Sequence, residues 1–143
     1  MKLVVAIPTY GRPGQTRLLL DHLTRQSRLP DEVVISAPDA SHVGELGDYA
    51  FPVTAVYGEP GLTRQRNAAL DYALSRFDVI TFFDDDFIPA DNYLELVADA
   101  FAGHDNWAVL MGRVVKDGAP NAGLDWDAGL EALQEAAAAA PPS

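Results

Sequence analysis

The chain has 143 residues, 48% of them hydrophobic, with a formal net charge of -11 and no cysteine. This length suits one compact domain, and the absence of cysteine excludes disulfides and thiolate sites. The negative charge opposes broad contact with nucleic acid or anionic lipid, so we expect neither as a partner. No apolar run approaches the roughly 18 residues that a membrane span needs, and a reducing, cytoplasmic setting is the expectation.

Continuous apolar runs and amphipathic stretches alternate along the chain. The apolar runs predict strands buried on both faces of a sheet, at Leu3–Ile7, Glu32–Ile35, Val53–Tyr57, Val79–Phe83 and Ala108–Val115. The helical patterns between them centre on Leu19–Leu23, Leu62–Leu74 and Leu94–Phe101. This order predicts βαβ units, and therefore an α/β fold with a mostly parallel sheet flanked by helices.

The remaining segments define the expected domain organisation. Ser36–Pro52 is rich in Pro and Gly and reads as a long loop with room for a short helix. We predict an α/β domain over residues 1–115, followed over 116–143 by a loop, an Ala-rich helix at Ala128–Ala140 and a tail. The side of the sheet near Val109–Val115 is then short of covering, which predicts either self-association into a homo-oligomer or covering by that helix.

Three consecutive carboxylates, Asp84, Asp85 and Asp86, directly follow a strongly apolar predicted strand. Open α/β sheets bind ligands at the carboxyl ends of their strands. Alternation places Asp84 and Asp86 on roughly the same side, an arrangement suited to Mg²⁺ or Mn²⁺ that also takes phosphate oxygens. The alternative is a solvated acidic turn, but three adjacent like charges cost stability unless a cation is present.

Two further loops join this picture. Pro8-Thr9-Tyr10-Gly11-Arg12 follows the first strand, and by itself it suggests a turn chosen for backbone shape. The aspartates at the end of a neighbouring strand favour a second interpretation, in which this loop forms part of a ligand crevice. The loop over residues 58–67 enters a helix, with Thr63 placed to cap it and Arg66 and Asn67 near its start, where anions are favoured. The three histidines, His22, His42 and His104, lack ligand spacing and read as surface or core residues.

Taken in order, these motifs resemble the amino-terminal half of family 2 glycosyltransferases, which have the GT-A fold. The resemblance covers Met1 to about Val115. Five segments carry it: Pro8–Arg12, where the family has Pro-Thr-Tyr-Asn-Arg; Pro30–Ile35, the family's second strand; Gly61–Leu70, similar to Gly-x-x-x-Ala-Arg-Asn-x-Gly-Leu; Phe82–Pro89, the family's metal motif; and Met111–Val114, similar to a Gly-Gly-Arg strand. Gly11 replaces the usual Asn, and Asp39 stands, shifted, where the family places a base-binding carboxylate.

The resemblance implies metal-dependent transfer of a sugar from a nucleoside diphosphate sugar of the UDP or GDP type to an acceptor hydroxyl, usually with inversion. It assigns donor binding to Pro8, Thr9, Tyr10, Arg12, Asp39, Arg66, Asn67, Asp84 and Asp85, and Mn²⁺ or Mg²⁺ to Asp84 and Asp86. The catalytic base is expected beyond Ser143. Two alternatives stay open: another metal-dependent nucleotidyltransferase, which needs a Gly-rich basic loop after the first strand, and a non-catalytic or truncated nucleotide-binding module.

Overall fold

The computed structural model describes residues 1–117 and 125–139 of the chain. It divides into two compact units, Met1–Asp105 and Asn106–Ser143. No helix among the described residues is long and apolar enough to cross a membrane.

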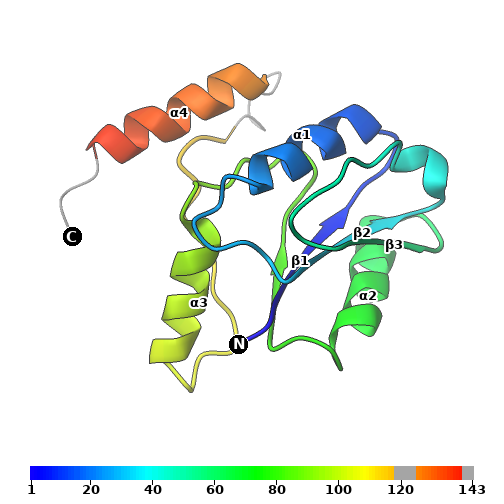
Figure 1. Ribbon diagram of the computed structural model, residues 1–143, viewed down its shortest axis with the longest axis horizontal. Coiled ribbons are helices and arrows are strands. Elements are labelled where there is room, and N and C mark those ends of the chain that lie inside the picture. The colour runs from blue at the N-terminus through cyan, green and yellow to red at the C-terminus, as the bar shows by residue number, and fades with distance from the viewer. Residues whose placement is uncertain (118–124, 140–143) are drawn as a thin grey trace. The chain divides into compact units, whose positions relative to one another are not determined.

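The first unit is built on a four-stranded parallel sheet (Figure 1). Its strands are β1 (Leu3–Pro8), β2 (Glu32–Ala37), β3 (Val53–Tyr57) and β4 (Val79–Phe82), and they lie in the order β3-β2-β1-β4. All six residues of β1 are buried. A central parallel strand is covered on both faces, which is why its sequence is apolar without alternation. The predicted α/β class with a parallel sheet is confirmed.

Helices α1 (Pro13–Leu23), α2 (Leu62–Ala73) and α3 (Tyr93–Gly103) cover the two faces of this sheet. Alternate β1 residues pack to opposite sides. Leu3, Val5 and Ile7 join one apolar cluster with leucines of α1 and α3. Val4 and Ala6 join the other with alanines of α2. Figure 1 shows α1 and α2 on opposite sides of the sheet, so the unit has three layers.

The packing of α1 makes a first testable prediction. Leu20 is fully buried against the sheet, whereas Leu18, two residues earlier, is 40% exposed. Leu20→Ala is expected to lower the free energy of unfolding by about 2–5 kcal/mol, because it removes apolar contacts and leaves a cavity. Leu18→Ala is the matched control and should change it by about 0.5 kcal/mol at most. Urea titrations of both variants make the measurement, and equal losses would contradict this packing.

One predicted strand is wrong. Residues 107–117, which include Ala108–Val115, form neither helix nor strand, and Val109 and Met111 are 81% and 88% exposed. An apolar run becomes a strand only when a neighbouring strand satisfies its backbone hydrogen bonds. The second unit contains no strand among its described residues. The apolar sequence of Ala108–Val115 was therefore not sufficient for strand formation.

Two other predictions outside the sheet, a short helix after β2 and an Ala-rich helix near the end of the chain, are confirmed. The long loop after β2 contains a short 3-10 helix, η1 (Ala40–His42), as expected. The Ala-rich helix is present as α4 (Trp126–Ala139) and begins two residues before the predicted start, while Ala140 lies outside the described residues. The boundary at residue 115 and the self-association stay predictions.

Candidate functional site at the ends of β1 and β4

The strand order places a switch point between β1 and β4. From β1 the chain moves through α1 to β2 and β3, and it then returns through α2 to β4 on the other side of β1. Open α/β sheets bind ligands outside the carboxyl ends of the strands at such a point. The register pairs Ala6 with Phe82, and the Phe83 amide donates to the Ala6 carbonyl at 3.0 Å. Continued along both strands, this register brings Thr9 opposite Asp85.

Asp85 is the buried centre of this site, with 7% of its surface exposed. The Thr9 hydroxyl donates to its Oδ2 at 2.8 Å, and Arg12 Nη1 donates to its Oδ1 at 3.3 Å. The Thr16 hydroxyl lies 3.0 Å from that of Thr9. Burial raises the pKa of the Asp85 carboxyl, while the Thr9 hydrogen bond and the Arg12 charge act in the opposite direction. A single carboxylate therefore ties the loop after β1 to the loop after β4.

The flanking carboxylates of Asp84 and Asp86 point to solvent, with 59% and 63% of their side chains exposed. Each faces an arginine. Arg66 Nη2 lies 3.2 Å from Asp84 Oδ1, and Arg12 Nη1 lies 3.6 Å from Asp86 Oδ2 as well as binding Asp85. Three carboxylates against two guanidinium groups leave an acidic cluster that is partly neutralised by its own chain.

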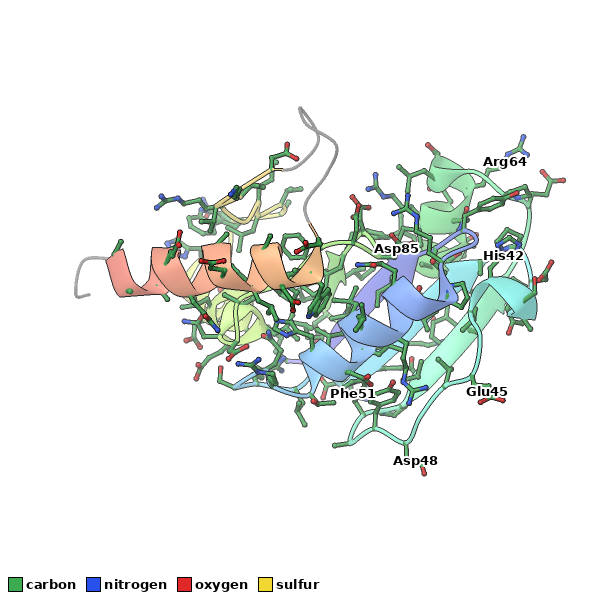
Figure 2. The ribbon with its side chains drawn as sticks, turned by 90° about the horizontal axis from the view of Figure 1, so that it is seen from above. His42, Glu45, Asp48, Phe51, Arg64 and Asp85 are labelled. Atoms are coloured by element: carbon green, nitrogen blue, oxygen red, sulfur yellow. The ribbon has the colours of Figure 1, made fainter. Side chains whose placement is uncertain are left out.

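A second group of side chains lies at the ends of β1 and β2. His42 Nδ1 accepts a hydrogen bond from the Gly11 amide at 2.7 Å, and the His42 ring lies 4.6 Å from the ring of Tyr10, which is 61% exposed. Asp39 accepts from the Ser41 amide at 2.8 Å and so begins η1. The hydrogen bonds that Asp39 accepts from the Ser41 hydroxyl and from the Ser41 amide lower its pKa. Figure 2 labels His42 and Asp85, which come from the two ends of this site.

The start of α2 differs from the prediction. Gly61, not Thr63, occupies the capping position, with φ +129°, and no side chain caps the helix in the usual way. A φ in this range suits glycine and disfavours other residues. Instead, the Gly61 amide donates to Oε1 of the buried Gln65 at 3.2 Å. The predicted Thr63 cap is therefore wrong, because the side chain of Gln65, within the helix, accepts the hydrogen bond from the Gly61 amide.

The structure brings together most of the predicted residues. Thr9, Arg12, Asp85 and Asp86 form one connected group, and Arg66 with Asp84 adjoins it. The other predicted residues have different surroundings: Pro8 is buried at the end of β1, the Tyr10 ring lies tilted by 43° against that of His42, Asp39 begins η1, and Asn67 is exposed on α2. Two further arginines near these loops, Arg17 and Arg64, pair elsewhere, with Asp21 and Glu59.

Sequence reasoning missed Gln65 and His42. A signal existed for Gln65, since it shares a four-residue spacing with the buried Ala69 and Ala73. A polar residue on a buried helix stripe needs hydrogen-bond partners. No comparable signal existed for His42, because its partners Gly11 and Tyr10 are about thirty residues away in the sequence.

Asp84 and Asp86 are the residues that could hold a divalent cation. Within residues 1–117 and 125–139, no group of three or more His, Asp or Glu side chains is arranged to hold a metal by itself. Mg²⁺ commonly takes only one or two carboxylates and completes its shell with water and substrate phosphates. Two exposed carboxylates with hard oxygen atoms fit that kind of site and do not fit an all-protein cage.

A parallel sheet wound in both directions from a central strand, with polar side chains at the switch point, is the architecture of the doubly wound α/β class, which binds ligands at this edge. Residues 4–124 match the family described as Glycosyl transferase family 2. This chain belongs to that family of glycosyltransferase enzymes.

Solved structures support the same fold. S. aureus TarS 1–349 in complex with UDP is 24% identical, with a TM-score of 0.55 over 73% of this chain and 33% of that chain. S. aureus TarS is 20% identical, with a TM-score of 0.55 over 82% and 24%. The complex of TarS 1–349 with UDP-GlcNAc is 24% identical, with a TM-score of 0.53 over 73% and 32%. The chain thus spans a third or less of these proteins, and no curated protein sequence matches it.

Proposed function

We propose that this chain binds a nucleoside diphosphate sugar of the UDP or GDP type and serves a glycosyltransferase that moves the sugar to an acceptor hydroxyl with inversion. The observation that carries the proposal is the buried Asp85, flanked by exposed Asp84 and Asp86, at the switch point between β1 and β4. The UDP and UDP-GlcNAc complexes of TarS are consistent with this choice of ligand.

The charges of the site suit a diphosphate accompanied by a cation. By itself the acidic cluster repels phosphate, because its carboxylates outnumber its arginines. A divalent cation at Asp84 and Asp86 would reverse the sign of the local charge and leave Arg12 and Arg66 free to face phosphate oxygens. When bound, Mn²⁺ or Mg²⁺ stabilises the charge of the departing diphosphate. The family match favours this reading over a nucleotidyltransferase.

Each side chain then has a defined task. Asp85 holds the Thr9–Arg12 loop in place beside the acidic cluster. Tyr10, exposed on the same loop, offers an aromatic face for stacking of a nucleobase. Arg66 contributes a cation whose Nε is buried and lacks a hydrogen-bond partner within the described residues. We assign no residue of this chain as the base that takes the acceptor's proton.

Arg66 supplies a direct test of the donor site. Arg66→Ala removes a charged hydrogen-bond donor, typically worth about 1.5–3 kcal/mol, so the Kd for UDP or GDP should rise about 10- to 150-fold. The control is Arg64→Ala, which removes an exposed arginine of the same helix that pairs with Glu59. Titration calorimetry with Mn²⁺ gives the affinities. A lowered melting temperature in Arg66→Ala with unchanged affinity would make Arg66 structural.

Binding alone does not separate an enzyme from a nucleotide-binding module. Transfer of labelled sugar from UDP and GDP donors to hydroxyl acceptors separates them when this chain is compared with one extended into any natural downstream sequence, because a module retains the donor affinity and transfers nothing in either form. The same assay reports the configuration of the new glycosidic bond, and retention would contradict the inverting reaction.

A further inference from the structure

Gln65 is a buried polar side chain that touches three elements at once. It is 5% exposed and lies on the face of α2 that packs against the sheet. Its Nε2 donates to the Thr9 carbonyl at 2.7 Å and to the Ser36 carbonyl at 2.8 Å. Its Oε1 accepts from the Gly61 amide at 3.2 Å. Both amide hydrogens and the amide oxygen are therefore used.

Gln65 thus binds backbone groups at the places where strands end and a helix begins. Ser36 lies at the end of β2, where its carbonyl also accepts from the Thr9 amide at 2.9 Å. Thr9 is the first residue after β1. The Gly61 amide precedes the first turn of α2, where backbone donors lack partners within the helix. The single side chain of Gln65 therefore forms hydrogen bonds with backbone groups at the end of β1, the end of β2 and the start of α2.

These contacts lie one step from the proposed donor-binding residues. The Thr9 hydroxyl binds Asp85, and the same loop carries Arg12. On the other side, Gln65 directly precedes Arg66, which pairs with Asp84. Gln65 therefore contacts both the loop after β1 and the start of the helix that carries Arg66.

We propose that Gln65 is a positioning residue of the donor site: it fixes the Thr9–Arg12 loop and the first turn of α2 relative to each other, so that Arg12 and Arg66 approach the same ligand. This inference rests on the proposed function. Gln65 itself touches no ligand. A side chain of this kind limits the spread of distances between groups that must act together.

The test compares Gln65→Met, which keeps the length and apolar volume but removes the hydrogen bonds, with Gln65→Ala. Two quantities are measured: the Kd for UDP and GDP with Mn²⁺, and amide hydrogen exchange over residues 9–12 and 61–66. The matched control is Tyr72→Phe, which removes a partly buried hydrogen bond between α2 and Glu32 at 3.2 Å, away from the site.

We expect both Gln65 variants to bind nucleotide about 10- to 100-fold more weakly, and we expect faster exchange in those two segments only. Exchange over residues 53–57 should stay as in the unmodified chain. Tyr72→Phe should lower the melting temperature without changing either quantity.

Unchanged exchange over residues 9–12 and 61–66 in a folded Gln65→Met would overturn the proposal. So would unchanged nucleotide affinity in a folded variant, or failure of both variants to fold, which would make Gln65 a purely structural residue. If the unmodified chain binds neither UDP nor GDP, the proposed function fails, while the exchange measurement still decides the role of Gln65.

Discussion

UDP or GDP is expected to raise the melting temperature of this protein only when Mn²⁺ or Mg²⁺ is supplied. The physical reason is the surplus of carboxylates over arginines around Asp84, Asp85 and Asp86, which opposes a diphosphate until a cation binds. At a nucleotide concentration 100 times its Kd, binding adds about 2.7 kcal/mol to the free energy of unfolding. Each kcal/mol raises the melting temperature by roughly 2–4 °C in a protein of about this size.

The metal ligands are tested by the double change Asp84→Asn with Asp86→Asn, which should abolish the dependence on Mn²⁺ and most of the nucleotide-induced stabilisation. Asp71→Asn is the matched control, because Asp71 is an exposed aspartate on α2. Thermal melting with nucleotide, with Mn²⁺, with both and with excess chelator gives the comparison. Equal stabilisation by nucleotide in chelator would contradict metal dependence.

Replacement of Asp85 should separate stability from ligand binding. Asp85→Ala removes the acceptor that Thr9 and Arg12 share, and it is expected to cost about 1–3 kcal/mol of folding free energy. Asp85→Asn keeps an acceptor oxygen and removes the buried charge. We expect the Asn variant to fold at least as stably as the unmodified chain near pH 7, yet to bind nucleotide more weakly, because Thr9 and Arg12 bind different carboxylate oxygens and an amide keeps only one of them.

The pKa of Asp85 gives the direction of the pH effect. Burial raises that pKa above the ordinary value of 3.8, so the folded state favours the protonated carboxyl more than the unfolded state does. The contribution of Asp85 to stability is therefore largest below pH 3.8 and decreases as the pH rises through the raised pKa. Denaturant titrations of Asp85→Asn between pH 3 and 7 should lack this component. A less stable Asn variant at pH 7 would show that the ionised carboxylate is held for stability and not for a ligand.

An Asp85→Asn variant that is at least as stable as the unmodified chain but binds nucleotide more weakly would fit a site that gives up stability for function. A buried carboxylate beside two others is unfavourable in the free protein, and arginines offset only part of the repulsion. The ion pairs of Arg12 and Arg66 with the aspartates then describe how the free site is held together before the cation and diphosphate bind.

Local sequence determined the sheet, the helices and the position of the acidic cluster. The buried strands could be predicted because an apolar run such as Leu3–Ile7 has only one stable environment, with a helix layer on each face. The aspartates could be predicted as a site because they directly follow such a strand, whatever the rest of the chain does. The strand predicted at Ala108–Val115 was wrong because strand formation also needs a neighbouring strand, and apolar composition does not provide one.

Only the tertiary structure decided which loops meet and which side chains fasten them together. Parallel register brings Thr9 to Asp85 across 76 residues of sequence and places Gln65 against Thr9 and Ser36. The fold of the segment after β2 also brings His42 to Tyr10, whereas Asp39 accepts from Ser41, two residues away, at the start of η1. Hydrogen bonds between distant residues leave no periodic trace in a sequence, because each depends on where two separate strands end. The chemistry of the site was therefore readable from the residues, while its geometry was set by the fold.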